Sequence, residues 1–405
     1  MQGCLSDIRV LELGQVLAGP YAAMILGDMG AEVIKVESPN GGDSARRTPP
    51  HFYKGESIYF MSLNRNKRSV VIDLTSQQGR EVFYDLVKKS DVVIDNLRHG
   101  VLEQLEIDHP VLLKHNPRII SCSINGYGSD SPDRFKPSFD LMVQAKGGGM
   151  SLTGTPDGPP LRMGVSISDH VAGIYAVTGI LAALHETART GKGRRIEVPL
   201  FSTMLSLLSY EAALHLHSGE VPGPVGSGHR SLIPYNAVKT RDGYIVIDAH
   251  LPKFWSALCD ALRIEGIEKD PRFHTLAARN GNRDELLKIL DGIFPSKTSR
   301  EWLEILEEKG VPCAPINDLK AALEDETTKA LKMVVDIEHK GVGLTFRAVG
   351  NPVRMPDAEE TQYSSPPLLG EHTEEVLREV AGYSDDRIEA LLRDGVVAKR
   401  VSSEQ

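Results

Sequence analysis

The first forty residues alternate between short apolar runs and a turn that contains glycine, and this alternation restricts the fold more than any other part of the chain. Residues 7–13 and 31–37 have the composition of buried strands. Between them, residues 14–20 (GQVLAGP) predict a turn and then a helix that runs through Leu26. A strand, a helix and a second strand in so few residues form a βαβ unit, from which parallel, doubly wound sheets are built.

The same alternation continues as far as residue 124. Strands are predicted at residues 69–73, 91–95 and 118–124, with helices at 78–89 and 100–107. Each of these strands is a short apolar run bounded by polar residues, which is typical of a parallel sheet covered by helices on both faces. We therefore expect an α/β fold with a Rossmann-like large domain. Because Gly14 is followed next by Gly19, the first turn lacks the G-x-G-x-x-G spacing of an NAD-dependent dehydrogenase.

The length of 405 residues exceeds what one hydrophobic core usually covers, so a second domain is expected. Residues 219–228 are rich in Gly and Pro and predict a domain boundary. After it, a strand at 243–248 and three helices up to residue 309 predict a smaller α+β domain. We expect a large domain at 1–218, a small domain at 219–316, and a return segment at 317–405 that completes the large domain.

The composition excludes several classes of function. A net charge of −9 disfavours nucleic acid as the main partner. We find no apolar run long enough to cross a bilayer and no secretory signal, and so predict a cytoplasmic protein with no membrane partner. The four cysteines form no C-x-x-C pair, so the sequence predicts neither a disulfide framework nor a metal site.

Polar residues follow the predicted strands, where ligands of open α/β sheets collect. Residues 46–68 add a cluster of Arg and Lys that includes Arg68, and Lys136 follows further along. Such a basic segment either is a solvated surface or binds phosphates. The polar residues after the strands are Gln15, Glu37, Asn96, Arg98 and Tyr127.

Residues 163–185 place one carboxylate, Asp169, at the head of a long stretch of small and apolar residues. The Ser168-Asp169 pair predicts a helix start, and a helix that is apolar on nearly every face is expected to be buried. The positive end of the helix dipole there favours an ionised carboxylate. Asp169 is therefore either a helix cap or a carboxylate nucleophile at the floor of a site.

The order and spacing of short motifs resemble those of CoA-transferase family III, which includes formyl-CoA:oxalate and dicarboxylate CoA-transferases and α-methylacyl-CoA racemase. The resemblance runs from about residue 5 to residue 396. Its motifs are residues 9–13 (RVLEL), 17–20 (LAGP), 30–37 (GAEVIKVE), 64–68 (NRNKR), 96–98 (NLR), 126–128 (GYG), 139–140 (FD), 168–169 (SD), 310–315 (GVPCAP) and 368–373 (LLGEHT).

This resemblance implies that Asp169 is the nucleophile that forms an acyl-aspartyl anhydride and then an aspartyl-CoA thioester. Gln15 matches a residue beside the reacting acyl group, where its amide steadies a developing oxyanion; a turn-capping side chain is the alternative. The enzyme would hold no permanent cofactor and no metal, since coenzyme A and acyl-CoA are substrates. The candidate CoA-binding residues are Arg98, Lys136, Arg68, Glu37 and Asn96.

Two relatives of different activity serve as alternatives. Racemases of this family have a His before the Asp that matches Asp140, whereas this chain has Phe139, which cannot transfer a proton. Formyl-CoA:oxalate enzymes have a run of glycines where this chain has residues 226–235 (GSGHRSLIPY). We interpret His229 and Arg230, with Gly228 and Tyr127, as residues that recognise a dicarboxylic substrate, with succinyl-CoA as donor; a basic surface linker is the simpler alternative.

The resemblance also implies an interlocked homodimer. Heteromeric members of the family pair an active chain with an inactive one, so a heteromer with a paralogous subunit is an alternative. The presence of Asp169 favours an active chain over a non-catalytic CoA-binding subunit.

Overall fold

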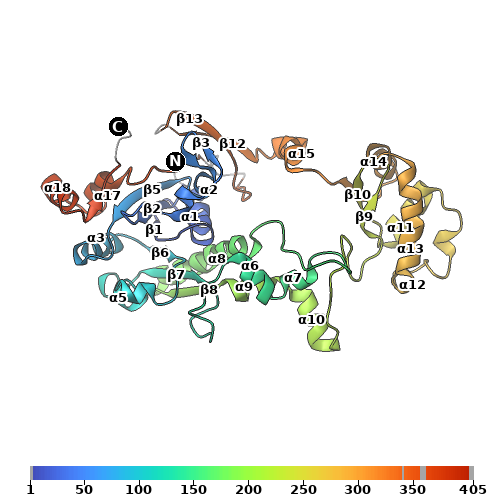
Figure 1. Cartoon of the computed structure of the whole chain (residues 1–405), viewed down its shortest axis with the longest axis horizontal. Helices are drawn as coiled ribbons and strands as arrows, with labels where there is room; N and C mark the ends of the chain where they lie inside the picture. Colours follow the sequence, from blue (N-terminus) through green and yellow to red (C-terminus); the bar gives the residue numbers. More distant parts are fainter. Residues whose placement is uncertain (1–2, 340–341, 356–361, 401–405) are drawn as a thin grey trace. The chain divides into compact units, whose positions relative to one another are not determined.

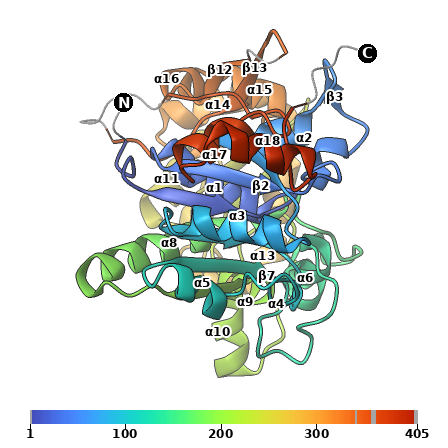
Figure 2. The ribbon, with the colours of Figure 1, turned by 90° about the vertical axis from the view of Figure 1, so that its left-hand side faces the viewer.

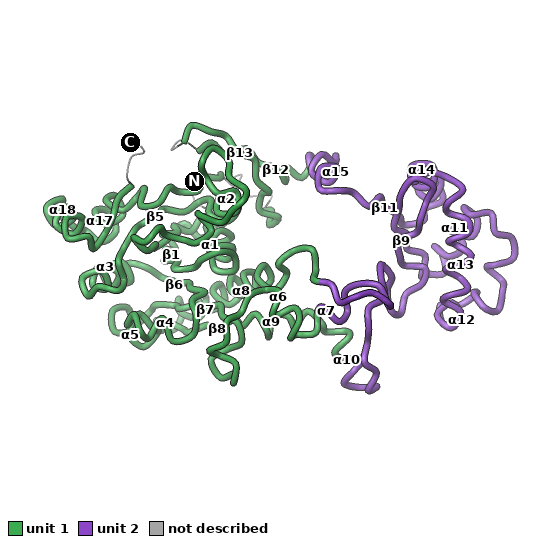
Figure 3. Tube along the Cα trace, viewed as in Figure 1, with its two compact units in different colours: residues 1–149, 162–213, 330–405 green, residues 150–161, 214–329 purple. Residues whose placement is uncertain are grey.

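The computed structural model describes residues 3–339, 342–355 and 362–400, and the chain forms two compact units (Figure 3). Unit 1 contains residues 1–149, 162–213 and 330–405, and unit 2 contains residues 150–161 and 214–329. Unit 2 thus differs from the expected 219–316 domain by starting at 214, by ending at 329 and by including residues 150–161.

Unit 1 is built on a seven-stranded sheet with the order β14-β5-β2-β1-β6-β7-β8. Neighbouring strands are parallel, except that β14 pairs antiparallel with β5. The parallel α/β architecture expected from the sequence is confirmed. The strands are β1 (Arg9–Glu12), β2 (Glu32–Glu37), β5 (Lys67–Ile72), β6 (Val92–Asp95), β7 (Ile120–Asn125), β8 (Arg195–Pro199) and β14 (Val397–Ala398).

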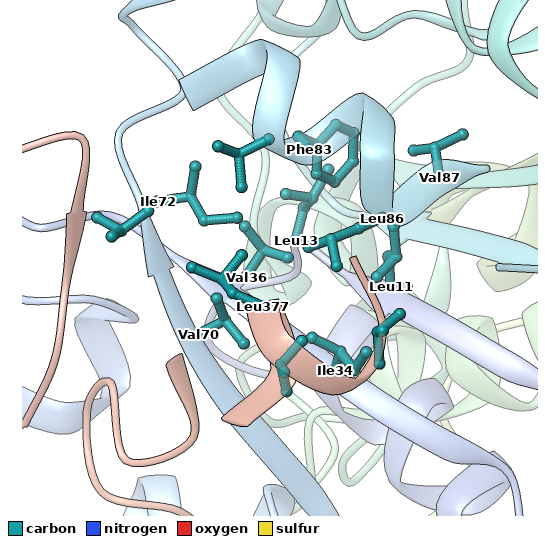
Figure 4. Packing of buried hydrophobic residues seen from close by; sticks show 14 of the residues in the cluster. Leu11, Leu13, Ile34, Val36, Val70, Ile72, Phe83, Leu86, Val87 and Leu377 are labelled. Carbon is teal, nitrogen blue, oxygen red and sulfur yellow. The ribbon is translucent and has the colours of Figure 1, made fainter. Parts of the chain in front are cut away.

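Helices cover both faces of this sheet. Successive residues of a strand point to opposite faces, so neighbouring residues of one strand contact different helices. Leu11 of β1 packs with helix α3 (Gln77–Val87), whereas its neighbour Val10 packs with α1 (Ala18–Asp28) and α8 (Ile167–Thr190). Figure 2 shows α3 and α17 (Thr373–Glu379) on the side of the sheet that faces the viewer. Figure 4 shows Phe83, Leu86 and Leu377 pointing toward the side chains of β1, β2 and β5.

Helix α8 differs from the expectation of a helix buried all round. Ala172, Ala176 and Ile180 are fully buried against the sheet, but Ile174, Tyr175 and Leu181 are exposed. We also expected no segment long and apolar enough to span a membrane, and α8 is one by length and composition. Its buried face identifies it as a core helix of the α/β layer structure. The apolar helix expected at 201–217 is split into α9 (Leu200–Leu207) and α10 (Ser209–Ser218).

Unit 2 has its own antiparallel sheet with the order β11-β10-β9 and its own core. Trp255, Phe273 and Trp302 are almost completely buried in this core. The unit therefore contains both an antiparallel sheet and helices. Its main elements are β9 (Tyr235–Lys239), β10 (Tyr244–Asp248), α11 (Pro252–Leu262), α12 (Leu276–Gly281), α13 (Arg283–Ile293), α14 (Ser299–Glu308) and β11 (Cys313–Pro315), which Figure 1 labels.

Candidate active site

Two of the predicted site residues meet at the point where the strand order reverses. The chain moves from β1 outward to β2 and β5 and then returns to the other side of β1 with β6. Gln15 follows β1 and Asn96 follows β6, so both lie beyond the carboxyl ends of neighbouring parallel strands. This switch point is where ligands of open α/β sheets bind.

The Asn96 side chain makes a reciprocal pair of hydrogen bonds with the Gln15 backbone. The Gln15 N–H donates to Asn96 Oδ1 at 2.7 Å, and Asn96 Nδ2 donates to the Gln15 carbonyl at 2.8 Å. The Gln15 side chain is exposed and has no hydrogen-bond partner among the residues that the structure describes. Its amide is therefore available to a ligand, and turn capping, the alternative reading of Gln15, is carried out by Asn96.

Asp169 lies one helical turn before the point where α8 packs tightly on α1. A Cβ atom added at Gly173 would lie 2.9 Å from Tyr21 Cδ1 and 3.1 Å from the Ala18 carbonyl oxygen, so the helix backbones approach closely there. The Tyr21 and His170 rings are also in edge contact, 4.9 Å apart. Residues four apart share a helix face, which puts Asp169 on the α8 face that meets the first turn of α1, just after Gln15.

The first turn of α8 is held by another carboxylate. The Ser168 N–H donates to Asp140 Oδ1 at 3.0 Å, and Gln144 Nε2 donates to Asp140 Oδ2 at 2.7 Å. Asp140, Gln144 and Ser168 are buried. Helix α8 starts at Ile167, one residue before the pair that predicted its start, and Asp169 is not its cap. The first alternative for Asp169, a helix cap, is therefore wrong.

The Asp169 carboxylate is half-buried and forms no hydrogen bond or ion pair with any residue in the described ranges. Burial, together with the nearby Asp140 charge, raises the pKa of Asp169 to about 7. We expected the helix dipole to favour the ionised form. Desolvation and the like charge outweigh that effect, because both act directly on the carboxylate whereas the dipole is a partial charge.

Tyr59 is a site residue that the sequence reasoning missed. It lies in α2 (Ile58–Leu63), and burial together with the charges of Asp169, Asp43 and Asp140 raises the pKa of its hydroxyl to about 12. The Tyr59 hydroxyl therefore lies within electrostatic range of all three carboxylates. No local sequence pattern identifies it, since it follows a short helix start that resembles an ordinary turn.

Most of the basic segment at 46–68 is paired inside unit 1. Arg46 contacts Glu37 at 2.7 Å, Arg65 contacts Asp28 at 2.6 Å, and Lys67 reaches Glu12 at 3.4 Å. Arg68, a predicted CoA-binding residue, forms ion pairs with Glu32, Glu375 and Glu379. Glu37, which was also predicted to bind CoA, is buried and accepts a hydrogen bond from Ser69 Oγ at 2.6 Å.

Arg98 and Lys136, in contrast, are exposed and lie on loops that meet. The His99 and Phe135 rings are in edge contact, 5.0 Å apart, and Phe135 is 69% exposed. The Arg98 side chain has no partner among the described residues, and Lys136 pairs only with Asp133, at 2.6 Å. Of the predicted CoA-binding residues, these two present cationic groups at the surface.

Tyr127, a predicted substrate residue, is on the loop after β7. The Nζ atom of Lys146 lies over its ring, 4.9 Å from the ring centre.

The predicted substrate residues Gly228, His229 and Arg230 belong to unit 2, where α12 and α13 hold their loop. Arg283 Nη2 donates to the Arg230 carbonyl at 2.9 Å. His229 Nδ1 accepts hydrogen bonds from the Ser231 and Leu232 N–H groups at 3.1 and 3.2 Å. The His229 proton therefore resides on Nε2, and the ring is held as a hydrogen-bond donor.

Comparisons with known proteins identify the family to which the chain belongs. The sequence pattern of CoA-transferase family III matches residues 5–373. The chain is 37% identical to the succinyl-CoA:glutarate CoA-transferase of Mus musculus, over 97% of this chain and 90% of that protein. It is 36% identical to the succinyl-CoA:mesaconate CoA-transferase of Haloarcula hispanica, over 96% and 99%. The crystal structure of a CAIB/BAIF family protein from Brucella suis has a TM-score of 0.83 and 36% identity, covering 94% of this chain and all of that one.

Proposed function

We propose, since this chain belongs to CoA-transferase family III, that it transfers CoA from an acyl-CoA donor, succinyl-CoA in the simplest case, to a dicarboxylic acid. The observation that carries the proposal is the Asp169 carboxylate, half-buried, without a partner among the described residues and one helical turn from the point where α8 packs on the first turn of α1. Relatives named for succinyl-CoA with glutarate or mesaconate support the choice of substrates.

In the first half of the reaction Asp169 acts as the nucleophile. Its carboxylate oxygen attacks the thioester carbonyl of the donor, the carbon–sulfur bond breaks, and CoA leaves as a thiolate, which gives an acyl-aspartyl anhydride. The thiolate then attacks the Asp169 carbonyl, releasing the donor acid as a carboxylate and leaving an aspartyl-CoA thioester. The acceptor carboxylate repeats these two steps in reverse order, so that acceptor-CoA forms and the Asp169 carboxylate is restored.

The surroundings of Asp169 favour this chemistry. A carboxylate in water is a weak nucleophile, but burial has raised the pKa of Asp169 to about 7, so its ionised form is more basic than an ordinary carboxylate. The developing negative charge on the thioester oxygen needs a hydrogen-bond donor, and we assign the Gln15 amide to it. Arg98 and Lys136 would bind the phosphates of CoA.

Recognition of the second carboxylate is assigned to Arg230 and His229. A guanidinium binds a carboxylate through two parallel hydrogen bonds, and the His229 tautomer offers a donor. A matched pair of variants tests this part. Arg230→Ala should raise KM for the dicarboxylate by about tenfold or more, whereas Arg241→Ala, which removes another arginine of unit 2, should leave it unchanged. Equal effects of the two variants would contradict the assignment.

We also propose that the protein is a homodimer of interlocked chains. The exposed apolar side chains Ile174, Tyr175 and Leu181 on α8 support an interface, because soluble monomers rarely expose such a stripe. Sedimentation velocity should give a dimer at micromolar concentration, and a stable monomer would contradict this part. We place the protein in the cytoplasm, since Cys4, Cys122, Cys259 and Cys313 are unpaired, as is typical of a reducing compartment.

The experiment that tests the function is a panel of acyl-CoA donors crossed with mono- and dicarboxylate acceptors, using the purified chain alone and mass spectrometry of the CoA esters. Succinyl-CoA with a dicarboxylate should give the fastest exchange. Hydroxylamine added during turnover should modify Asp169 and no other residue. Faster exchange with formyl-CoA and oxalate, or with acetyl-CoA and a monocarboxylate, would overturn the substrate assignment; no exchange by the chain alone would indicate a non-catalytic or heteromeric subunit.

A further inference from the structure

The backbone of residues 14–16 is held by side chains from other parts of unit 1. Lys35 Nζ donates to the Gly14 carbonyl at 2.7 Å, and Asn96 bonds both backbone groups of Gln15. The Val16 N–H donates to Asp43 Oδ1 at 3.0 Å. Four successive polar groups of this turn are thus bonded to three side chains rather than to helix or strand neighbours, so that the position of the turn depends on those side chains.

The turn contains a residue in an unfavourable backbone conformation. Val16 has a φ of +66°, in the left-handed region that β-branched residues rarely adopt. Such a conformation persists only when the surrounding structure imposes it. The peptide group that joins Gln15 to Val16 is held at both of its polar atoms, because Asn96 Nδ2 donates to its carbonyl oxygen and its N–H donates to Asp43 Oδ1. These two contacts fix the plane of the peptide that leads into Val16.

The side chains that hold the turn are themselves fixed. Asp43 is buried, with its second oxygen 3.0 Å from Lys35 Nζ, and its Oδ1 also accepts from the Ala45 N–H at 2.9 Å. Gly19 packs closely on the turn, since a Cβ atom there would lie 3.1 Å from the Gly14 Cα and in ordinary contact with Asn96 Cγ, at 3.4 Å. Asp43 is therefore held by buried partners, and Asn96 lies in contact with the backbone at Gly19.

We propose that Asn96 and Asp43 are positioning residues for Gln15, holding Val16 in its left-handed conformation so that the Gln15 amide points toward the reacting acyl group. The inference rests on the proposed function, in which Gln15 stabilises the developing oxyanion. It gives Asn96 a role through Gln15 in place of the direct contact with CoA that the sequence suggested. If the turn had only a structural role, the effect of Asn96→Ala on kcat would not depend on which side chain is present at residue 15.

A double-mutant cycle between residues 15 and 96 tests this proposal. Asn96→Ala should lower kcat by about tenfold to a hundredfold with KM for acyl-CoA within about twofold, because positioning affects the transition state rather than binding. Gln15→Ala should lower kcat similarly, and the double variant should be no slower than Gln15→Ala. Asn96→Asp, which keeps the acceptor for the Gln15 N–H, should fall between wild type and Asn96→Ala.

Asn116 offers a matched control. Its side chain bonds the backbone of Val87, Ser90 and Arg118, away from the carboxyl ends of the strands. Asn116→Ala should lower the melting temperature about as much as Asn96→Ala and leave kcat unchanged. Multiplication of the effects of Gln15→Ala and Asn96→Ala, or a rise in KM for acyl-CoA with Asn96→Ala, would overturn the positioning role.

A rescue experiment separates strain from simple loss of contacts. Because glycine adopts a positive φ without steric cost, Val16→Gly should restore part of the kcat lost in Asn96→Ala. Glu106→Gly, at an exposed residue with a φ of +56° elsewhere in unit 1, should restore none. Equal behaviour of the two glycine variants would overturn the role of Val16. A wild-type enzyme without CoA transfer in the substrate panel would instead overturn the proposed function itself.

Discussion

Unit 1 contains carboxylates in two contrasting situations. Asp43 and Glu37 are buried with cationic partners, and although burial alone would raise each pKa, Lys35 beside Asp43 and Arg46 beside Glu37 lower both below their ordinary values. Asp169 is buried without such a partner, and its pKa rises to about 7. The contrast shows that pairing makes a buried carboxylate a structural anchor, whereas leaving it unpaired keeps it reactive.

The largest expected effect comes from removing the unpaired carboxylate. Asp169→Asn should lower kcat by at least about 10⁴-fold, because an amide cannot form the anhydride. Binding of CoA, measured by calorimetry, should persist. The same variant should raise the free energy of unfolding at pH 8 by roughly 1–2 kcal/mol, since it removes the cost of burying a charge. Near-wild-type turnover would show that Asp169 is not the nucleophile.

Removing a paired carboxylate should damage stability instead. Glu12 is buried and shared by Lys35 and Lys67, at 3.0 and 3.4 Å. Glu12→Ala leaves two buried ammonium groups short of a counter-charge and should cost about 3–5 kcal/mol in urea denaturation. A loss below about 1 kcal/mol would mean that the pairing contributes little.

The pH dependence of kcat further distinguishes the unpaired carboxylate of Asp169 from the paired carboxylates. The nucleophile must be ionised, so kcat should rise with pH through about 7, the pKa of Asp169. Asp140→Asn removes the like charge but keeps an acceptor for the Ser168 N–H, and should move this rise to lower pH. An unmoved profile would assign the rise to another group or to burial alone.

The smallest expected effects come from comparing Arg98, an unpaired arginine, with Arg68, a paired one. Arg98→Ala removes an exposed cation without a partner among the described residues and should raise KM for acyl-CoA by about tenfold, which corresponds to roughly 1.5 kcal/mol. Arg68→Ala removes a cation already paired with Glu32, Glu375 and Glu379, and should leave KM unchanged while lowering stability by about 1 kcal/mol or less. The reverse result would exchange their roles.

The sequence predicted the parallel sheet because its strands contain short apolar runs, as in residues 92–94 (VVI). It did not predict β8 or β14, which are edge strands, and β8 has partly exposed side chains. The exposed face of α8 was missed for a related reason. Composition shows that the helix is apolar, but only packing shows that the sheet covers one of its sides.

The site was predicted in part. Asp169 and Gln15 were found through their local motifs, and the structure brings their turns together. The pairing of Arg46, Arg65 and Lys67 was not predictable, because their carboxylate partners lie on other elements of the chain. Tyr59 was missed for the same reason, since its neighbours Asp169 and Asp140 are distant in sequence.

Gly173 lies at the point where α8, which carries Asp169, packs on α1, which follows Gln15. Because a methyl group there would press on Tyr21 and on the Ala18 carbonyl oxygen, Gly173→Ala would act as a spacer that separates α1 from α8 by a few tenths of an ångström. The chemical groups of Asp169 and Gln15 would stay intact while their separation changed. The missing side chain at Gly173 thus sets how closely α1 and α8 pack, and a substitution there changes that spacing without altering Asp169 or Gln15.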